Sequence, residues 1–320
     1  MTTVRRVLIT SILTLSCFTS AQAAWIWTPE TGRWINPKYA AKDSPKAQME
    51  WAMSFFEQKE YPRAAKEFYR LVRAYPRSEL APEAQYLLGV SYEKMDRPGN
   101  AFAAYKKLVE VYPFSERFKE GIEREYLLGK AFAEGKKVEW VGPIKFTSKE
   151  KAIEVFQHVV DHAPYGSYGD QAQFEMGEVL LSTDRWEEAQ RAFQRVLDSY
   201  PGSPLTEQAK FKIATCADRL SRDPSYDQSA TNDAMQWYKT FVEEHPDSEQ
   251  AADAEESLKR LREIKAQRLI EIGQFYEKQR KPKAALVYYR EALEQYPDTA
   301  AAAQALAKVT ELERSGGSKK

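Results

Sequence analysis

Two of the three histidines in this sequence are spaced so that they could bind one metal ion. His158 and His162 are four residues apart, so on a helix their side chains lie on one face, beside Asp161. Such a pair would suit a metal-dependent enzyme, but the sequence places no third ligand near it. Solvated or helix-end histidines are the simpler interpretation. We therefore expect no metal ion and no other cofactor, and the metal-dependent enzyme stays as an alternative that elemental analysis can test.

The sequence shows no other catalytic constellation. It lacks a phosphate-binding loop, a glycine-rich dinucleotide turn and a Gly-x-Ser-x-Gly nucleophile elbow. Lys and Arg number 47, as do Asp and Glu, so the formal net charge is +0 and there is no basic excess of the kind that nucleic acid selects. The sequence therefore predicts a non-catalytic protein that does not bind nucleic acid.

The elements that carry these residues are helical repeats, and residues 82–113 form the most regular one. If Pro82 is position 1, Leu88, Gly89 and Tyr92 are at positions 7, 8 and 11, Ala101 and Tyr105 are at 20 and 24, and Pro113 is at 32. This is the pattern of a tetratricopeptide repeat (TPR), a pair of antiparallel helices. The small residues allow the two helices to cross closely, the large ones fill the space around the crossing, and the proline ends the second helix.

The same pattern predicts about six units, near residues 45–76, 82–113, 122–164, 170–201, 207–246 and 266–297. The third and fifth units contain inserts between their helices, at 135–148 and 222–231. A long helical segment includes a bridging part at 248–265, a capping helix follows from Ala300 to Glu313, and residues 314–320 form a disordered tail. The sequence therefore predicts an all-α, right-handed solenoid of about six TPR helix pairs with a C-terminal capping helix.

Position 5 of the first helix in each unit is a candidate binding position. Stacked units expose their first helices on a concave wall, so positions 2, 5, 9 and 12 are expected to face a groove. The residues at position 5 are Met49, Tyr86, Tyr126, Phe174, Phe211 and Ile270, and Met53 and Val90 at position 9 extend the apolar strip. This groove would suit an extended or helical peptide with regularly placed apolar side chains. The same stripe would equally suit packing against neighbouring helices, and both interpretations stay open.

The N-terminus has the pattern of an export signal. Arg5 and Arg6 precede an apolar run, and Ala21-Gln22-Ala23 is a small-x-small cleavage site, so residues 1–23 are expected to be a signal peptide. Alternatively, Cys17 is the lipid-bearing cysteine of a bacterial lipoprotein. Under the first hypothesis Cys216 is the only remaining cysteine, and its apolar helical pattern predicts a buried, unreactive side chain.

Residues 24–43 are unlike the repeats. Trp25, Trp27 and Trp34 flank a Thr-Pro-Glu-Thr-Gly turn, with an alternation that suits a short hairpin. The three indoles need a surface to pack on. They would either cap the apolar end of the first repeat or contact the membrane interface or a partner.

More specific features recur between the units. Ala-Gln followed by an aromatic residue occurs in APEAQYLLG (81–89) and DQAQFEMG (170–177), with the variant EQAKFKIA at 207–214, and helices end in Tyr-Pro-x-Ser or a close relative at Tyr75, Tyr112, Tyr200 and Tyr296. With the insert in the third unit and the long helix, residues 44–313 resemble the BamD family. These are TPR lipoproteins of the machine that inserts β-barrel proteins into the bacterial outer membrane. The six units exceed the usual five of that family.

This resemblance implies a scaffold in the periplasm, at the inner face of the outer membrane, held there by peripheral or lipid-anchored contact. It also implies contacts with the β-barrel assembly complex through the C-terminal repeats and with unfolded outer-membrane protein segments in the N-terminal groove. The alternative is a periplasmic TPR adaptor of another envelope system, for cell-wall growth or outer-membrane constriction. Those relatives usually carry an N-terminal coiled coil, whose heptads residues 24–43 do not show.

Overall fold

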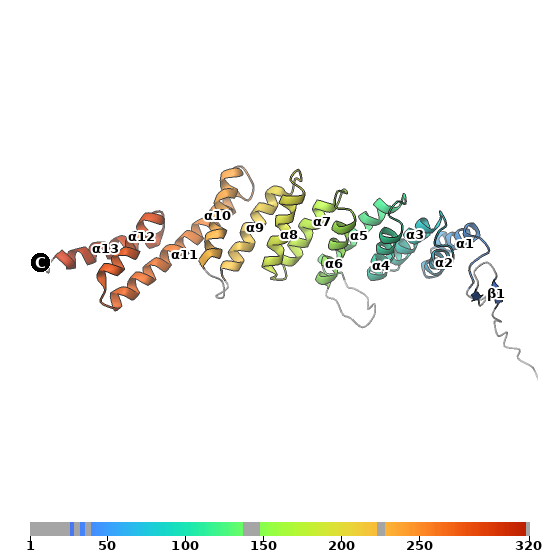
Figure 1. The fold of residues 1–320 in the computed structure, drawn as a ribbon, viewed down its shortest axis with the longest axis horizontal. Helices are drawn as coiled ribbons and strands as arrows, with labels where there is room; N and C mark the ends of the chain where they lie inside the picture. Colours follow the sequence, from blue (N-terminus) through green and yellow to red (C-terminus); the bar gives the residue numbers. More distant parts are fainter. Residues whose placement is uncertain (1–25, 29–32, 36–39, 137–147, 223–227, 318–320) are drawn as a thin grey trace, which may run out of the picture.

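The computed structural model describes residues 26–28, 33–35, 40–136, 148–222 and 228–317. These residues form thirteen helices and one two-stranded sheet, in an elongated array with the sheet at one end and the last helix at the other (Figure 1). The helices are α1 (Pro45–Glu57), α2 (Tyr61–Ala74), α3 (Ala81–Lys94), α4 (Pro98–Val111), α5 (Phe118–Ala133), α6 (Ser148–His162), α7 (Gly169–Leu181), α8 (Trp186–Ser199), α9 (Thr206–Ser221), α10 (Gln228–Glu244), α11 (Ala251–Lys278), α12 (Pro282–Gln295) and α13 (Ala300–Gly317). Each helix packs on the next one along the chain, so the protein is the predicted all-α TPR solenoid.

Proline and serine set many of the helix boundaries. A proline occupies the first or second position of α1, α2, α3, α4 and α12, where its missing N–H costs nothing. The Tyr-Pro-x-Ser motifs form the turns between pairs. In each, the serine N–H donates to the tyrosine carbonyl three residues earlier, at 3.1 Å for Ser78 and Ser115 and 2.9 Å for Ser203. These bonds close β-turns that lead the chain into the next first helix.

Glycine at position 8 makes room for a ring from the second helix of the same pair. A Cβ atom on Gly129 would lie 2.6 Å from Phe156 Cε1, and one on Gly177 would lie 2.6 Å from Phe193 Cε1. Gly89 and Gly273 meet Tyr105 and Tyr289 in the same close way. These rings are fully buried, so the predicted small-against-large crossing is confirmed.

The glutamine of the Ala-Gln motif is a buried clamp between the two helices of a pair. The Nε2 atoms of Gln48, Gln85 and Gln173 donate to backbone carbonyls on the second helix, at 3.1, 2.8 and 3.0 Å. Each acceptor lies 19 residues after its glutamine. All three glutamines are 1% exposed, so the motif fixes the register between the helices of these three pairs.

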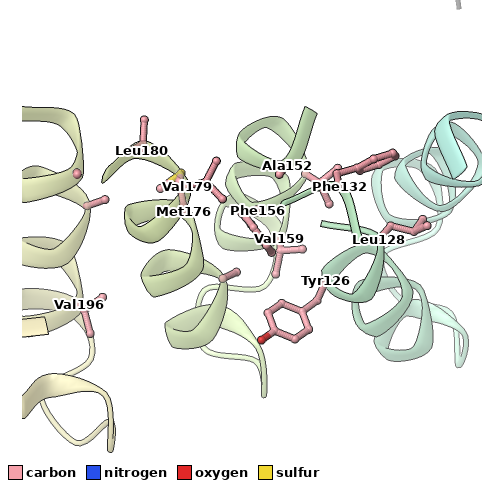
Figure 2. Packing of buried hydrophobic residues seen from close by; sticks show 14 of the residues in the cluster. Tyr126, Leu128, Phe132, Ala152, Phe156, Val159, Met176, Val179, Leu180 and Val196 are labelled. Atoms are coloured by element: carbon pink, nitrogen blue, oxygen red, sulfur yellow. The ribbon is translucent and has the colours of Figure 1, made fainter. Parts of the chain in front are cut away.

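The apolar core runs along the array instead of gathering at one centre. The largest cluster spans α4 to α9, and Figure 2 shows its side chains interleaved between neighbouring helices, among them Tyr126, Phe156, Val159 and Met176. Separate clusters lie in α1 to α4, in α9 to α11 and in α11 to α13. Each pair therefore depends chiefly on its neighbours for burial.

The long helix α11 serves two pairs. Its N-terminal half packs on α10, and its C-terminal half forms the last pair with α12. From its middle, Glu263 accepts hydrogen bonds from the N–H groups of Ala300 and Ala301 at 2.8 and 3.0 Å, and thus caps α13. Arg262 pairs with Asp298 beside it.

Three helix boundaries differ from the sequence-based expectation. Helix α13 continues to Gly317, beyond the expected end at Glu313. Helices α6 and α10 begin inside the inserts expected at 135–148 and 222–231.

The two strands, β1 (Ile26–Thr28) and β2 (Arg33–Ile35), are antiparallel, and Trp27 lies opposite Trp34. This is a short hairpin where the sequence suggests one. Trp27 is 48% exposed. Several predicted features lie outside the described residues. They are the signal peptide 1–23 with Cys17, Trp25, residues 137–147 and 223–227 of the inserts, and residues 318–320 of the tail.

Candidate peptide-binding surface

The candidate surface consists of the position-5 side chains and their apolar neighbours on the first helices, and the structure places these residues at different depths. Met49, Tyr86, Phe174 and Phe211 are half-buried, as are Met53 and Val90. Tyr126 is only 6% exposed and Ile270 only 1%. Six of these eight side chains therefore have accessible area, while Tyr126 and Ile270 serve chiefly as core.

Each position-5 aromatic ring packs on the position-24 ring of its own pair. The ring centroids of Tyr86 and Tyr105 are 5.8 Å apart, and those of Phe174 and Phe193 are 5.3 Å apart. Tyr126 contacts Phe156 in the same way, and Phe211 contacts Tyr238, both at 6.0 Å. One edge of each half-buried ring is thereby fixed by the core, which holds the accessible part in a defined orientation.

Charged side chains flank these rings. The Arg117 guanidinium lies 4.8 Å from the centroid of the Tyr86 ring and pairs with Glu83 at position 2. The hydrogen bond from Arg117 to Glu83 raises the pKa of Arg117, so this cation persists at all relevant pH values. Lys130 Nζ lies 6.0 Å from the Tyr126 ring, and burial raises the pKa of Tyr126 to about 12. The surface therefore combines apolar rings with fixed charges at its edges.

The apolar character is strongest in the first two pairs. Met49 and Met53 pack with Phe55 and Phe56 against the core of α1 to α4. Val90 continues the strip on α3. Methionine side chains adapt their shape to irregular partners, so this part of the surface is suited to varied apolar side chains.

Two features of the surface have no counterpart in the sequence-based predictions. One is a pocket of about 210 Å³, which is lined by Glu93, Arg97, Pro98, Arg124, Leu127, Leu128 and Lys136. Phe114 and Tyr165 stand fully exposed in the turns after α4 and α6, at 101% and 92%. The position of Phe114 as the variable residue of a Tyr-Pro-x-Ser turn was a usable signal for its exposure.

The histidines His158 and His162 differ in environment. His162 ends α6 and is exposed, as expected for a helix-end histidine. The expectation of a solvated side chain is wrong for His158, which is 6% exposed because its Nδ1 lies 2.8 Å from Glu125 Oε2 inside the core. Burial raises the pKa of Glu125, and its hydrogen bond with His158 opposes that shift.

Cys216 is fully buried, as predicted. Burial raises the pKa of its thiol to about 12, which leaves almost no thiolate at neutral pH. In the part of the chain that the structure describes, no helix combines the length and the apolar character that a membrane crossing needs.

Comparisons with known proteins agree with this fold. The tetratricopeptide repeat model matches residues 49–116, and the model of the outer membrane lipoprotein family YfiO matches residues 143–320, which is more than half of the chain. The fold and the repeats thus define a TPR solenoid protein. The chain belongs to the YfiO outer membrane lipoprotein family, as its resemblance to BamD proteins predicts.

Curated relatives are named outer membrane protein assembly factor BamD. The protein of Caulobacter vibrioides is 25% identical over 161 residues, which cover 50% of this chain and 53% of the relative. That of Xylella fastidiosa strain 9a5c is 26% identical over 195 residues, covering 57% of this chain and 62% of the relative. The match thus spans between half and two thirds of the length of these relatives.

Solved TPR structures also align with the chain. A tetratricopeptide repeat protein from Parabacteroides merdae is 13% identical, with a TM-score of 0.34, over 83% of this chain and 98% of that protein. The TPR protein YrrB is 16% identical, with a TM-score of 0.35, over 69% of this chain and 94% of that protein.

Proposed function

We propose that this chain is a non-catalytic scaffold of the bacterial cell envelope that takes part in assembling β-barrel proteins into the outer membrane. Membership of the YfiO family and the BamD relatives support this role. In this proposal the protein works in the periplasm at the inner face of the outer membrane. A lipid on Cys17, or contact through Trp25, Trp27 and Trp34, would hold it there.

The observation that carries the proposal is the strip of half-buried apolar side chains on the first helices. Met49, Met53, Tyr86 and Val90 offer apolar area on two consecutive pairs, and Phe174 and Phe211 repeat the arrangement further along. Membrane-spanning β-strands alternate apolar and polar residues, so an unfolded strand in extended form presents apolar side chains at regular intervals. The strip is suited to bind such a segment, with the C-terminal repeats left for the assembly complex.

A binding experiment tests this assignment. The probe is a fluorescent peptide with the alternating sequence of a membrane β-strand, and anisotropy gives its affinity. We expect the Met53→Ser/Val90→Ser variant to bind the peptide at least tenfold more weakly, because both side chains are half-buried on the first helices. Thermal melting monitors the fold of each variant.

The matched control is Val111→Ser/Val287→Ser, which changes apolar residues that are 50% and 60% exposed on the second helices α4 and α12. We expect this control to change the affinity less than twofold. Equal loss in both variants, or no binding to the unchanged protein, would contradict a peptide site on the first helices.

The partner assignment needs a separate measurement. Affinity purification of the protein from envelopes, with mass spectrometry, should recover components of the β-barrel assembly complex. Recovery of cell-wall growth or constriction proteins alone would instead support the envelope adaptor. The mass of the N-terminal fragment in the same sample distinguishes lipidation at Cys17 from cleavage before Ala24.

A further inference from the structure

Three side chains of the kinds that can bind a metal ion meet where the second helices of the second and third pairs pack together. Glu110 lies on α4, and His158 and His162 lie one turn apart on α6. One ligand atom from each lies within 4.8 Å of the other two. The imidazole rings are stacked, with centroids 4.0 Å apart and planes at 28°. The pair of histidines seen in the sequence therefore acquires a third ligand from the preceding repeat.

The hydrogen-bond acceptors of both histidines assign the proton of a neutral ring to Nδ1, and the lone pair to Nε2. His158 Nδ1 is 2.8 Å from a carboxylate oxygen of Glu125, and His162 Nδ1 is 3.0 Å from the carbonyl oxygen of His158. Carboxylate and carbonyl oxygens are acceptors, so each Nδ1 carries the proton that it donates. In the neutral form of each ring, the remaining nitrogen is the one that can bind a metal ion.

His158 Nε2 is the atom that most needs a partner. It is buried, has no hydrogen-bond partner among the described residues, and lies 3.6 Å from Glu110 Oε1. That distance is too long for a hydrogen bond, and in the neutral ring the Nε2 lone pair would face a carboxylate oxygen, which is unfavourable. A cation between the two atoms would satisfy both groups.

Glu125 replaces the glutamine found at the same position in other pairs, and its carboxylate can support a metal-binding histidine. It occupies the position of the buried clamp glutamines Gln48, Gln85 and Gln173, whose amides donate to backbone carbonyls. A carboxylate cannot donate to a carbonyl, and Glu125 Oε2 instead lies 2.8 Å from His158 Nδ1. A carboxylate that holds the far nitrogen of a metal-binding histidine is the usual outer support of such sites, because it fixes the tautomer and orients the ring.

We propose that Glu110, His158 and His162 form a binding site for a divalent zinc ion, supported by Glu125, that pins α4 to α6. Two imidazoles and one carboxylate are a common ligand set for Zn²⁺ with a fourth position left to water. The site lies on second helices, apart from the first-helix surface proposed to bind peptides. Its role is to fix the angle between the second and third pairs.

The cluster needs only a small adjustment to close around an ion. Bonds of 2.0–2.1 Å in tetrahedral geometry place ligand atoms roughly 3.4 Å apart. Glu110 and His162 are exposed at the surface, so their side chains can move inward, whereas Glu125 fixes His158. Lys106, which lies 4.0 Å from Glu110, is the competing cation.

A zinc titration of the full chain, purified with a histidine-free tag, tests the site. We expect one Zn²⁺ per chain and a higher melting temperature with the ion. Glu110→Gln and His162→Ala should each weaken binding at least tenfold and still fold, because both side chains are exposed. Glu125→Gln should weaken it about 10–100-fold through loss of the outer carboxylate.

The matched control is His245→Ala, since His245 is the one other histidine in the sequence. It should bind Zn²⁺ like the unchanged protein. Nitrogen-15 NMR of the histidine rings adds a direct signature, because Zn²⁺ should shift Nε2 of His158 and His162 and leave His245 unchanged. Binding unaffected by His162→Ala and Glu110→Gln, or a His158 Nε2 that carries a proton and ignores Zn²⁺, would overturn the site in favour of a buried ion pair.

Discussion

At the scale of single residues, the fold depends on four glycines that have no side chain where two helices of a pair cross. Gly89, Gly129, Gly177 and Gly273 each face a buried ring at a distance that a Cβ atom would violate. Glycine lowers helix propensity by about 1 kcal/mol relative to alanine, so its presence inside these helices needs a steric reason. The close approach of the rings provides it.

Replacing Gly177 by alanine should destabilise the protein. The new Cβ would lie 2.6 Å from Phe193 Cε1, and the Phe193 ring is fully buried among its neighbours, so any shift of the ring disturbs the core. Overpacking of this kind costs about 1–3 kcal/mol, which exceeds the gain in helix propensity. We expect a net loss of about 1–2 kcal/mol in the free energy of unfolding, measured by denaturant titration. Gly202→Ala, with no atom within 4 Å of the new Cβ, should have little effect.

At the scale of helix pairs, buried hydrogen bonds set the register that apolar packing alone leaves loose. The clamp glutamines reach the second helix at a constant separation of 19 residues. In the fifth pair Lys210 holds the equivalent position and pairs with Glu244. The clamp is therefore a property of the first, second and fourth pairs. The third and fifth pairs, which contain inserts, have charged side chains at this position, and the sixth has Leu269.

Gln173→Met tests the clamp because it keeps the side-chain volume and removes the donor to the Ala192 carbonyl. We expect a loss of about 1 kcal/mol, the net value of a buried hydrogen bond. Gln194→Met is the control, since the Gln194 amide reaches Asp198 on the exposed face of α8. Equal stability of the two variants in denaturant titrations would show that the buried bond adds nothing.

At the scale of the whole molecule, the helices α11 and α13 complete the array. Glu263 caps the N-terminus of α13, and apolar residues of α11, α12 and α13 share one cluster. Because contacts in a solenoid are local, this end can open without the rest.

Glu263→Ala should loosen α13 selectively. Loss of a carboxylate at a helix N-terminus costs about 0.5–2 kcal/mol. Amide hydrogen exchange should therefore become faster in α13, while α1 to α8 keep their protection. Glu271→Ala is the control, because Glu271 also lies on α11. It is 3.9 Å from Arg268 and caps no helix among those described. Unchanged exchange in α13 would mean that apolar packing alone holds it.

Much of this fold is predictable because one short pattern repeats. Position 8, position 24 and the terminal proline identify each pair, and α11 follows from a long segment without Gly or Pro before Gly273. The depth of side chains at position 5 was not predictable. Tyr126 is buried because Tyr168, from the turn before α7, stacks on it at 4.9 Å, a contact between distant residues. Glu110 is brought to His158 and His162 by the same packing of successive pairs.

The continuity of α11 fixes the rotational phase of the last pair relative to the five before it. A helix advances about 100° per residue, since it has 3.6 residues per turn. One residue inserted near the middle of α11 would therefore swing α12 and α13 by about 100° around its axis and leave both ends folded. The length of α11, 28 residues, thus determines which side of the molecule its C-terminal end presents to a partner.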